Sequence, residues 1–358
     1  MIVEIGGRGI GDGAPPFLIA EVGVNHNGSP ETALRLVDAA AVAGADAVKF
    51  QTFSAEALAT ARAPLAEYQR RGSASGSQLE MLRALELPRE ALRAARDRAV
   101  ELAITFLSTP FDLPSVQLLA DLGVPAYKVG SGDLTNLILL RAVAARRRPL
   151  IVSTGMATLA EVEAAVAAVR AAGDPPLILL HCTSAYPAAA ADANLRAMAT
   201  LRERFGVPVG YSDHTLGVAT AIAAVALGAA VVEKHLTLDR SLSGPDHAAS
   251  LEPAEFAEMA AGLRDAHAAL GDGRKEPRSG EADTTLASRR SLVAARAVKA
   301  GAPIAAGDID ARRPAGGISP MRLDEVVGRR AARDLVPGAQ LHAKDLDPPL
   351  DPAAEPGG

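Results

Sequence analysis

Eight short apolar runs recur through the first two thirds of the chain, and segments with a helical pattern separate them. The runs cover residues 17–25, 46–53, 104–110, 127–132, 150–155, 177–183, 207–214 and 231–238. Each run is continuously apolar, as expected of strands that are covered on both faces. A strand followed by a helix, eight times in succession, predicts an α/β fold of the (β/α)8 TIM-barrel class. A doubly wound open sheet built from the same elements is the alternative.

Local signals mark where the helices between these runs begin. Ser29 followed by Pro30 is a typical start, and Thr158 with Glu161 forms a capping-box pattern before a long alanine-rich segment. The glycine-rich stretch GRGIGDG near the N-terminus precedes Pro15 and Pro16, and no helix follows it. It therefore predicts a hairpin turn and not a phosphate-binding loop.

The barrel pattern ends near residue 270, so we expect a catalytic domain at 1–272. A polar linker is predicted at 273–290, a small β-rich domain at 291–347 and a disordered tail at 348–358. Within the small domain, segments 298–309 and 335–346 share a glycine, an apolar residue three positions later and an aspartate seven positions later. This repetition predicts a duplicated β unit that is marginally stable alone.

Composition excludes several classes of protein. The 358 residues are 49% hydrophobic and 22% charged, with a net charge of -5 and no basic stripe interleaved with aromatic residues, which argues against a nucleic-acid partner. Cys182 is the one cysteine, so neither an internal disulfide nor a multi-cysteine metal cluster is possible. Nowhere in the sequence do 18 uncharged apolar residues occur together, so no membrane span is predicted. We therefore expect a soluble, cytoplasmic protein.

Polar residues gather where the predicted strands end, which in a TIM barrel is the edge that carries the active site. Arginine outnumbers lysine 31 to 6, so each lysine is unusual in this chain. Three of the six, Lys49, Lys128 and Lys234, lie inside apolar runs, where a cation needs a partner. The strand-end residues are Glu21, Asn25, Lys49, Gln51, Ser108, Thr109, Lys128, Ser131, Ser153, Thr154, His181, Thr183, Ser212, His214, Lys234 and His235.

Two histidines at adjacent strand ends, His214 and His235, are the candidate ligands for a divalent metal acting as a Lewis acid. His181 lies further back on its strand and is a candidate for a supporting role. Two lysines with the hydroxyls of Thr109, Ser131, Ser153, Ser184 and Ser212 offer the charge and short donors that a phosphate and a carboxylate require. Cys182 has no catalytic partner nearby in sequence and is interpreted as a small buried side chain.

Eight ordered motifs carry a resemblance to a known family. They are IAEVGVNHNGS, GADAVKFQTF, FLSTPFD, YKVGSGD, STGMATLAEV, HCTSAYP, GYSDHTLG and EKHLTLDRSLSGPDHAASLEP. Together they resemble the N-acetylneuraminate (sialic acid) synthases over nearly all of residues 17–346, including a C-terminal antifreeze-like (SAF) domain. The resemblance implies a transferase that condenses phosphoenolpyruvate with an open-chain N-acetylated hexose of the N-acetylmannosamine type. The product is a nonulosonic acid, and phosphate is released.

The resemblance also assigns roles to individual residues. It implies a metal, Mn²⁺ before Mg²⁺ or Co²⁺, at His214 and His235, and catalytic roles for Glu21, Lys49, Lys128, His214 and His235. Phosphoenolpyruvate contacts fall on Lys49, Thr109, Lys128, Ser131, Ser153, Ser184 and Ser212. Sugar contacts fall on Glu21, Gln51, Tyr186, Asp246 and Arg313. The resemblance implies a domain-swapped homodimer in which Arg313 reaches into the partner's barrel.

The sugar side of the motifs departs from the family pattern. Ala185 stands where an acidic residue often precedes the tyrosine, and Ala315 stands where glycine is usual. Legionaminic or pseudaminic acid synthase, or a spore-coat polysaccharide relative, is therefore the alternative within the same fold. A non-catalytic sugar- or ice-binding protein is a third hypothesis.

Overall fold

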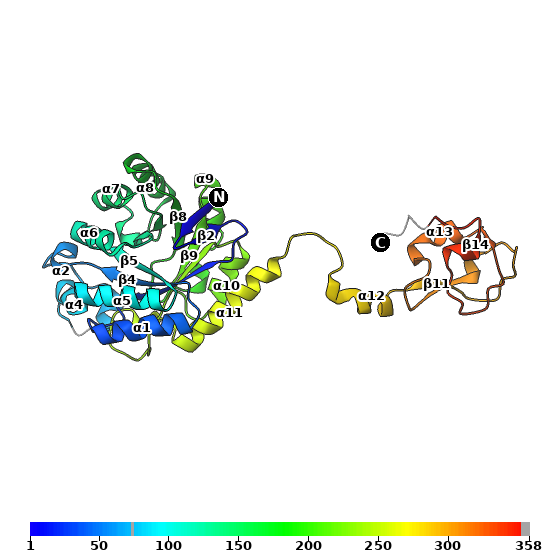
Figure 1. Ribbon diagram of the computed structural model, residues 1–358, viewed down its shortest axis with the longest axis horizontal. Helices are drawn as coiled ribbons and strands as arrows, with labels where there is room; N and C mark the ends of the chain where they lie inside the picture. The colour runs from blue at the N-terminus through cyan, green and yellow to red at the C-terminus, as the bar shows by residue number, and fades with distance from the viewer. Residues whose placement is uncertain (73–74, 352–358) are drawn as a thin grey trace. The chain divides into compact units, whose positions relative to one another are not determined.

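The structure of the chain is a computed structural model that describes residues 1–72 and 75–351. The chain divides into two compact units, of which the first is Met1–Asp272 and the second begins at Gly273. Helices surround a sheet in the first unit, and the second unit is built from short strands and turns (Figure 1). No helix among the described residues is both long and apolar enough to cross a membrane.

Eight parallel strands form the sheet of the first unit. They are β3 (Phe17–Gly23), β4 (Ala47–Thr52), β5 (Thr105–Pro110), β6 (Tyr127–Val129), β7 (Leu150–Ser153), β8 (Leu177–Cys182), β9 (Val209–Asp213) and β10 (Val231–His235). Their order is β5-β4-β3-β10-β9-β8-β7-β6, and β5 also contacts β6, so the sheet closes on itself. The (β/α)8 prediction is confirmed, and the open-sheet alternative is wrong.

Helices follow the strands and pack against the outside of the barrel (Figure 1). They are α1 (Pro30–Val42), α2 (Ala55–Leu58), α3 (Glu67–Gly72), α4 (Gln78–Leu85), α5 (Arg89–Glu101), α6 (Leu113–Leu122), α7 (Leu137–Ala144), α8 (Leu159–Ala172), α9 (Ala197–Phe205), α10 (Ala219–Ala226) and α11 (Pro253–Leu270). Ser29 caps α1 with Pro30 in its first turn, and Thr158 with Glu161 forms the expected capping box of α8.

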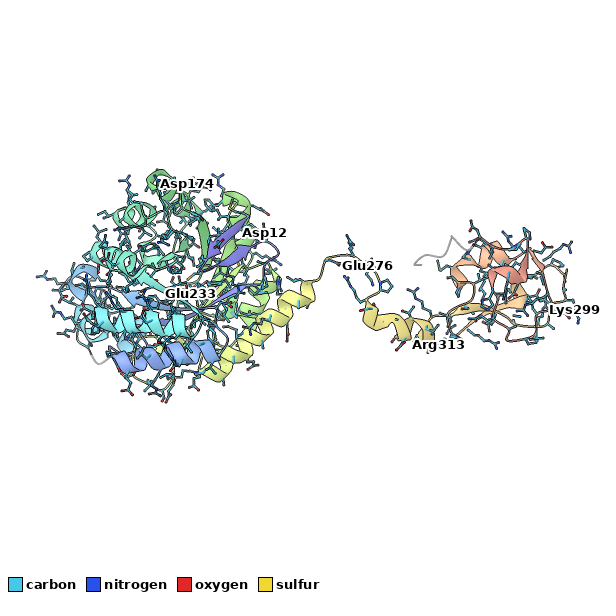
Figure 2. The ribbon with its side chains drawn as sticks, viewed as in Figure 1. Asp12, Asp174, Glu233, Glu276, Lys299 and Arg313 are labelled. Carbon is cyan, nitrogen blue, oxygen red and sulfur yellow. The ribbon has the colours of Figure 1, made fainter. Side chains whose placement is uncertain are left out.

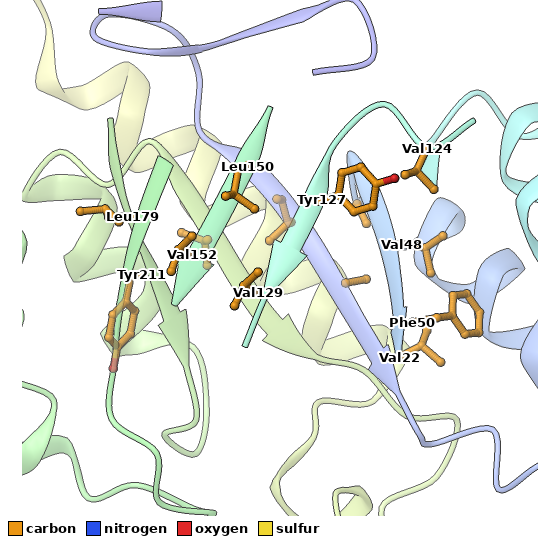
Figure 3. Close-up of a cluster of buried hydrophobic side chains, with 14 of the residues drawn as sticks. Val22, Val48, Phe50, Val124, Tyr127, Val129, Leu150, Val152, Leu179 and Tyr211 are labelled. Atoms are coloured by element: carbon orange, nitrogen blue, oxygen red, sulfur yellow. The ribbon is translucent and has the colours of Figure 1, made fainter. Parts of the chain in front are cut away.

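Two apolar layers hold the barrel. The outer layer lies between strands and helices and includes Val48, Val152 and Tyr211 (Figure 3). The inner layer fills the amino-terminal half of the barrel with Phe17, Ile19, Leu107, Ile151, Ile178, Leu180 and Val231. The hairpin of β1 (Ile2–Ile5) and β2 (Arg8–Gly11) adds Val3, Ile5 and Ile10 to this inner layer. The N-terminal glycine-rich stretch therefore belongs to a hairpin, as expected.

The second unit has its own apolar core, which includes Leu292, Ile304 and Leu341. Its elements are α12 (Ala282–Ser288), β11 (Ser291–Ala294), β12 (Ile309–Arg312), α13 (Leu323–Val326), β13 (Arg330–Ala331) and β14 (Leu346–Asp347). The predicted duplication is visible in matching ion pairs. Arg296 pairs with Asp308 in one copy and Arg333 with Asp345 in the other, and each aspartate is the last residue of a short 3-10 turn.

Two boundary expectations need correction. The predicted linker, 273–290, contains the 3-10 turn Ser279–Glu281 and helix α12, whose Leu286 carbonyl accepts a hydrogen bond from the Ala315 amide. The predicted tail begins too early, because Leu350 is buried in the core of the second unit. The rest of that tail, 352–358, lies outside the described residues.

Candidate active site

The alternation of side chains along each strand builds the site. On β7, Ile151 belongs to the inner apolar layer, and Ser153, two residues later, lines a cavity at the carboxyl end of the barrel. On β10, Val231 belongs to the same layer, whereas Glu233 and His235 line the cavity. Because strand side chains alternate with a period of two, the interior changes from an apolar layer to a polar layer within one step of each strand.

The cavity has a volume of ≈ 540 Å³ and collects most of the predicted site residues. Those that line it are Glu21, Gln51, Thr109, Lys128, Ser131, Ser153, Ser184, Tyr186, Ser212, His214, His235 and Asp246. Lys49 lies just behind this lining, and Arg313 belongs to the second unit. A cavity of ≈ 580 Å³ at the other end of the barrel has Asp12, Arg202 and His267 as its charged residues, none of them buried.

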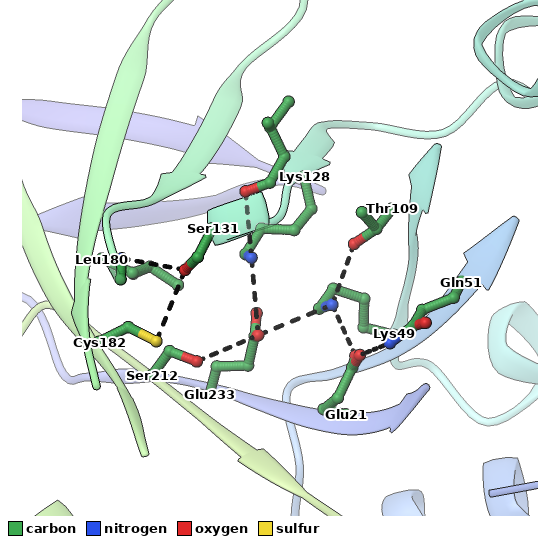
Figure 4. Close-up of polar contacts among 12 residues, drawn as sticks. Glu21, Lys49, Gln51, Thr109, Lys128, Ser131, Leu180, Cys182, Ser212 and Glu233 are labelled. Atoms are coloured by element: carbon green, nitrogen blue, oxygen red, sulfur yellow. Dashed lines mark hydrogen bonds and ion pairs between the residues drawn. The ribbon is translucent and has the colours of Figure 1, made fainter. Parts of the chain in front are cut away.

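A buried ionic cluster forms the floor of the cavity (Figure 4). Lys49 Nζ lies 2.6 Å from Glu21 Oε2 and 3.1 Å from Thr109 Oγ1. Glu233 Oε1 lies 3.7 Å from both Lys49 Nζ and Lys128 Nζ, and it accepts a 3.4 Å hydrogen bond from Ser212. All four charged residues are at most 5% exposed. Two ammonium groups and two carboxylates therefore neutralise one another out of contact with bulk water.

The charged groups of this cluster differ in the direction of their pKa shifts. Burial raises the pKa of Glu21 despite the opposing effect of Lys49. Burial acts to raise the pKa of Glu233 as well, but the two lysines outweigh it and hold that pKa below its ordinary value. Burial lowers the pKa of Lys128. Glu21 is thus the carboxyl group of this cluster that takes up a proton most readily.

The two predicted metal-binding histidines lie side by side above the cluster. The ring centroids of His214 and His235 are 5.4 Å apart. His214 Nδ1 lies 2.9 Å from the Thr183 carbonyl oxygen, which leaves Nε2 as the nitrogen with a free lone pair. His235 Nδ1 is buried and has no hydrogen-bond partner among the described residues. Burial, reinforced by nearby cations, lowers the pKa of His235 well below its ordinary value, so its ring is neutral.

These histidines fit a divalent metal ion whose remaining positions are filled by water or substrate oxygens. Neutral imidazoles with free lone pairs are the ligand form, and His235 carries an orphaned nitrogen at the site. In the described part of the chain, no group of three or more His, Cys, Asp or Glu side chains is arranged to hold a metal. The protein alone therefore offers an open coordination sphere and not a closed structural site.

Small hydroxyl and thiol groups line one wall of the cavity. The Ser131 hydroxyl accepts a 3.0 Å hydrogen bond from the Gly155 amide, and Cys182 Sγ lies 3.7 Å from Ser184 Oγ. A Cβ at Gly155 would lie 2.3 Å from Ser184 Oγ and 2.8 Å from Ser131 Oγ, so a larger residue there would displace these hydroxyls. Cys182 is buried, as expected, and its sulfur also lies 3.8 Å from His214 Nδ1 at the cavity lining.

Three of the predicted sugar contacts, Gln51, Tyr186 and Asp246, line the cavity beside Glu21 and the two histidines. Gln51 donates a 3.1 Å hydrogen bond to Glu21, and the Tyr186 ring lies 4.2 Å from the His214 ring and 4.8 Å from Tyr68 of α3. Asp246 Oδ2 lies 3.8 Å from His235 Nδ1. Burial and the charge of Glu21 raise the pKa of Asp246 to about 6. The lining also includes apolar side chains, which are Val24, Leu58, Met81, Leu82, Leu85 and Phe111.

Besides Lys49, six strand-end residues that the sequence directed to the cavity do not line it. They are Asn25, Ser108, Thr154, His181, Thr183 and Lys234. Most of them are out of phase with the inward-facing positions. His181 Nε2 contacts the Ala193 carbonyl, and its ring packs against Tyr211, so its expected supporting role is not borne out. Lys234 pairs with Asp213 outside the cavity.

Glu233 lies within the barrel unit (Figure 2) and is the main cavity residue that sequence reasoning missed, although it joins both lysines (Figure 4). Its signal was available, because it stands two residues before His235 and so must share its face of β10. The proximity of Cys182 to His214 had no such signal, since the two are 32 positions apart.

Fold and site together define a TIM-barrel protein with buried ions and paired imidazoles at the carboxyl ends of its strands. The model of the NeuB family matches residues 36–275, and the SAF domain matches residues 289–347. The chain belongs to the NeuB family and carries a C-terminal SAF domain, which confirms the resemblance seen in the sequence.

Relatives extend over almost the whole chain. N,N'-diacetyllegionaminic acid synthase of Legionella pneumophila is 45% identical over 91% of this chain and 93% of its own length. The Campylobacter jejuni enzyme of the same name is 45% identical over 89% of this chain and 96% of its own. The crystal structure of N-acetylneuraminic acid synthetase from Leptospira borgpetersenii, in complex with citrate, matches with a TM-score of 0.71 and 36% identity. It covers 79% of this chain and 95% of that one.

Proposed function

We propose that this protein condenses phosphoenolpyruvate with the open-chain form of an acetamido hexose, giving a nonulosonic acid and phosphate. The observation that carries the proposal is the shared cavity, in which Lys128 and a ring of hydroxyls face the paired rings of His214 and His235. One side of the cavity suits an anion with two charged ends, and the other suits an aldehyde that must be polarised.

A diacetamido sugar is the acceptor that we favour over the N-acetylmannosamine type expected first. Both 45% identical relatives are named N,N'-diacetyllegionaminic acid synthases. The outer wall of the cavity is apolar at Val24, Met81 and Leu85, which suits the methyl group of a second acetamido substituent. N-acetylmannosamine remains the alternative, because the Leptospira borgpetersenii synthetase is related at 36% identity.

A divalent metal ion, Mn²⁺ before Mg²⁺ or Co²⁺, is part of the proposal, with His214 and His235 as the residues that would hold it. When bound, such an ion supplies Lewis-acid polarisation of the aldehyde oxygen. In the proposed reaction, the methylene carbon of phosphoenolpyruvate attacks the aldehyde carbon.

The chain's own side chains position and compensate the reacting anion. When phosphoenolpyruvate binds, Lys49 and Lys128 contact its phosphate and carboxylate in place of part of their contact with Glu233. These contacts hold the enol in position for the reaction. As the new carbon-carbon bond forms, positive charge develops at the enol-ether carbon beside Glu21. Glu21, whose pKa burial raises, takes a proton from the water that adds to this carbon. Glu21 passes this proton to the former aldehyde oxygen, which becomes a hydroxyl. The carbon-oxygen bond to phosphate then breaks, the hydroxyl proton of the tetrahedral intermediate leaves with the phosphate, and a ketone remains.

Three further expectations belong to this proposal. They are a cytoplasmic location, a domain-swapped homodimer, and a contact of Arg313 with the sugar in the partner's barrel. In the structure, Arg313 is exposed, and its Nε donates a 3.0 Å hydrogen bond to the Ser288 carbonyl within its own unit. Its guanidinium therefore retains other donors for a carboxylate or sugar hydroxyl.

Product analysis tests the proposal. The purified chain is incubated with phosphoenolpyruvate, Mn²⁺ and either N-acetylmannosamine or a 2,4-diacetamido hexose, while phosphate release and product mass are followed. We expect phosphate only when all three components are present, and a faster reaction with the diacetamido sugar. Phosphate release without sugar, or no product from any acetamido hexose, would reject the condensation.

A further inference from the structure

Lys234 and Asp213 form an ion pair that lies outside the cavity. Lys234 Nζ is 2.7 Å from Asp213 Oδ2, and both side chains are completely buried. Asp213 on β9 and Lys234 on β10 lie opposite each other in the sheet. Asp213 directly precedes His214, and Lys234 directly precedes His235. The pair is thus adjacent in sequence to both predicted metal ligands.

The pair also anchors the segment that follows β9. Asp213 Oδ1 accepts hydrogen bonds from the Thr215 amide at 2.9 Å and from its hydroxyl at 2.8 Å. Lys234 Nζ donates to the Thr215 carbonyl. On the other side, the His214 carbonyl accepts a 2.9 Å hydrogen bond from the Ala188 amide. The backbone that carries His214 is therefore tied to β10, which carries His235.

Packing alone does not require charges at this place. The other outward-facing residues of these two strand ends, Tyr211, Val232 and Leu236, belong to the outer apolar layer. Apolar side chains of similar volume generally replace a buried ion pair with little loss of stability, so stability is a weak reason to keep one. An ion pair with three further hydrogen bonds to Thr215 sets the relative position of the two strand ends more narrowly than apolar contacts do.

We propose that Lys234, Asp213 and Thr215 are positioning residues that hold the His214 and His235 rings at the separation a shared divalent metal ion needs. This inference rests on the proposed function, because it presumes metal binding at the two histidines. Groups that orient metal ligands from behind typically change metal affinity by about 10- to 100-fold when they are removed.

The test measures Mn²⁺ binding by calorimetry, and the spectrum of bound Mn²⁺ by electron paramagnetic resonance, in the full chain. The variant D213N/K234M removes both charges but keeps an amide oxygen for Thr215. We expect a melting temperature close to that of the unchanged protein and Mn²⁺ affinity about 10- to 100-fold weaker. Asp46→Asn is the matched control, since Asp46 also joins neighbouring strands by accepting from the Leu18 amide and pairing with Arg8. It should leave Mn²⁺ affinity unchanged.

The outcomes separate two failures. Unchanged Mn²⁺ affinity in a folded D213N/K234M variant overturns the positioning role while the metal site stands. Mn²⁺ binding to the unchanged protein that His214→Ala does not affect overturns the metal site of the proposed function, and this inference with it. If the double variant does not fold, Thr215→Val removes one hydroxyl donor alone. A smaller loss of affinity is then expected, and unchanged affinity overturns the inference.

Discussion

The apolar and polar layers of the barrel interior are built by the same strands, and both exclude water. Ile151 and Ile178 in the apolar layer are 0% exposed, and Lys49 and Lys128 in the polar layer are 2% exposed. Burial of the apolar side chains stabilises the fold, whereas burial of the ions costs free energy that their partners only partly return. The difference teaches that stability alone does not account for the polar layer, which is the layer that the proposed function uses, whereas the apolar layer beneath it contributes stability.

The largest expected effect comes from removing an imidazole from the polar layer. His214→Ala should reduce turnover by about a thousandfold or more, which corresponds to losing several kcal/mol of Lewis-acid stabilisation. Phosphate release measures turnover, and circular dichroism checks that the barrel remains folded. Full activity in this variant would remove the metal from the mechanism.

A reciprocal pair of variants tests the division between the layers. Lys128→Met should lower kcat/KM for phosphoenolpyruvate by an amount equivalent to about 2–5 kcal/mol, because a buried charge partner is lost. Ile151→Ala should instead lower the free energy of unfolding by about 2–5 kcal/mol and leave kcat/KM unchanged in the folded protein. Urea unfolding and steady-state kinetics on both variants decide the matter. Equal kinetic losses would contradict the proposed separation.

The contribution of Asp246 to the free energy of unfolding depends on pH. Its pKa rises from 3.8 to about 6 on folding, so its contribution to stability is present below pH 3.8 and is lost as the pH rises through about 6. A shift of about 2 units corresponds to about 3 kcal/mol.

Asp246→Asn should therefore raise the free energy of unfolding by up to about 3 kcal/mol at pH 7.5, while sugar turnover falls. Near pH 4 the two proteins should be about equally stable. Urea unfolding without added metal at both pH values checks this. A gain in stability of the same size at both pH values would contradict a titrating Asp246.

The hydroxyl wall tests how closely the polar layer is packed. Gly155→Ala should cost about 1–3 kcal/mol of phosphoenolpyruvate binding, because the new methyl group displaces Ser184 and Ser131. Gly132→Ala is the matched control, since no atom lies within 4 Å of the added Cβ. KM for phosphoenolpyruvate should rise more in the first variant than in the second. The reverse order would show that the wall is not tightly packed.

The smallest expected effect lies outside the barrel unit. Arg313→Ala should raise KM for the sugar about tenfold and leave KM for phosphoenolpyruvate unchanged, as expected for one lost charged hydrogen bond. Steady-state kinetics with each substrate varied in turn measures both constants. An unchanged KM for the sugar would show that Arg313 is not part of the sugar site.

Much of this organisation was predictable from local sequence patterns. Continuous apolar runs and helix-start signals such as Ser29 and Thr158 predicted the barrel elements, because propensity and capping act over a few residues. The repeated glycine and aspartate spacing predicted the duplicated unit around Asp308 and Asp345. Boundaries were less predictable, since only packing shows that Leu350 belongs to the second core.

Whether an individual strand side chain points into the barrel or outward was predictable only in part. The sequence pattern directed Lys234 to the cavity and left out its neighbour Glu233, yet β10 turns Lys234 outward to Asp213 and Glu233 inward to two lysines. The period of two could have distinguished them once His235 was taken as inward-facing.

By itself, the sequence determined the strand-helix order, the family and the edge of the barrel where the polar residues gather, because these follow from patterns that are local along the chain. Only the tertiary structure decided that Glu233 lies between Lys49 and Lys128, and that Cys182 lies beside His214. These contacts depend on how the closed barrel sets the stagger between strands, and long-range strand stagger leaves no local mark in a sequence.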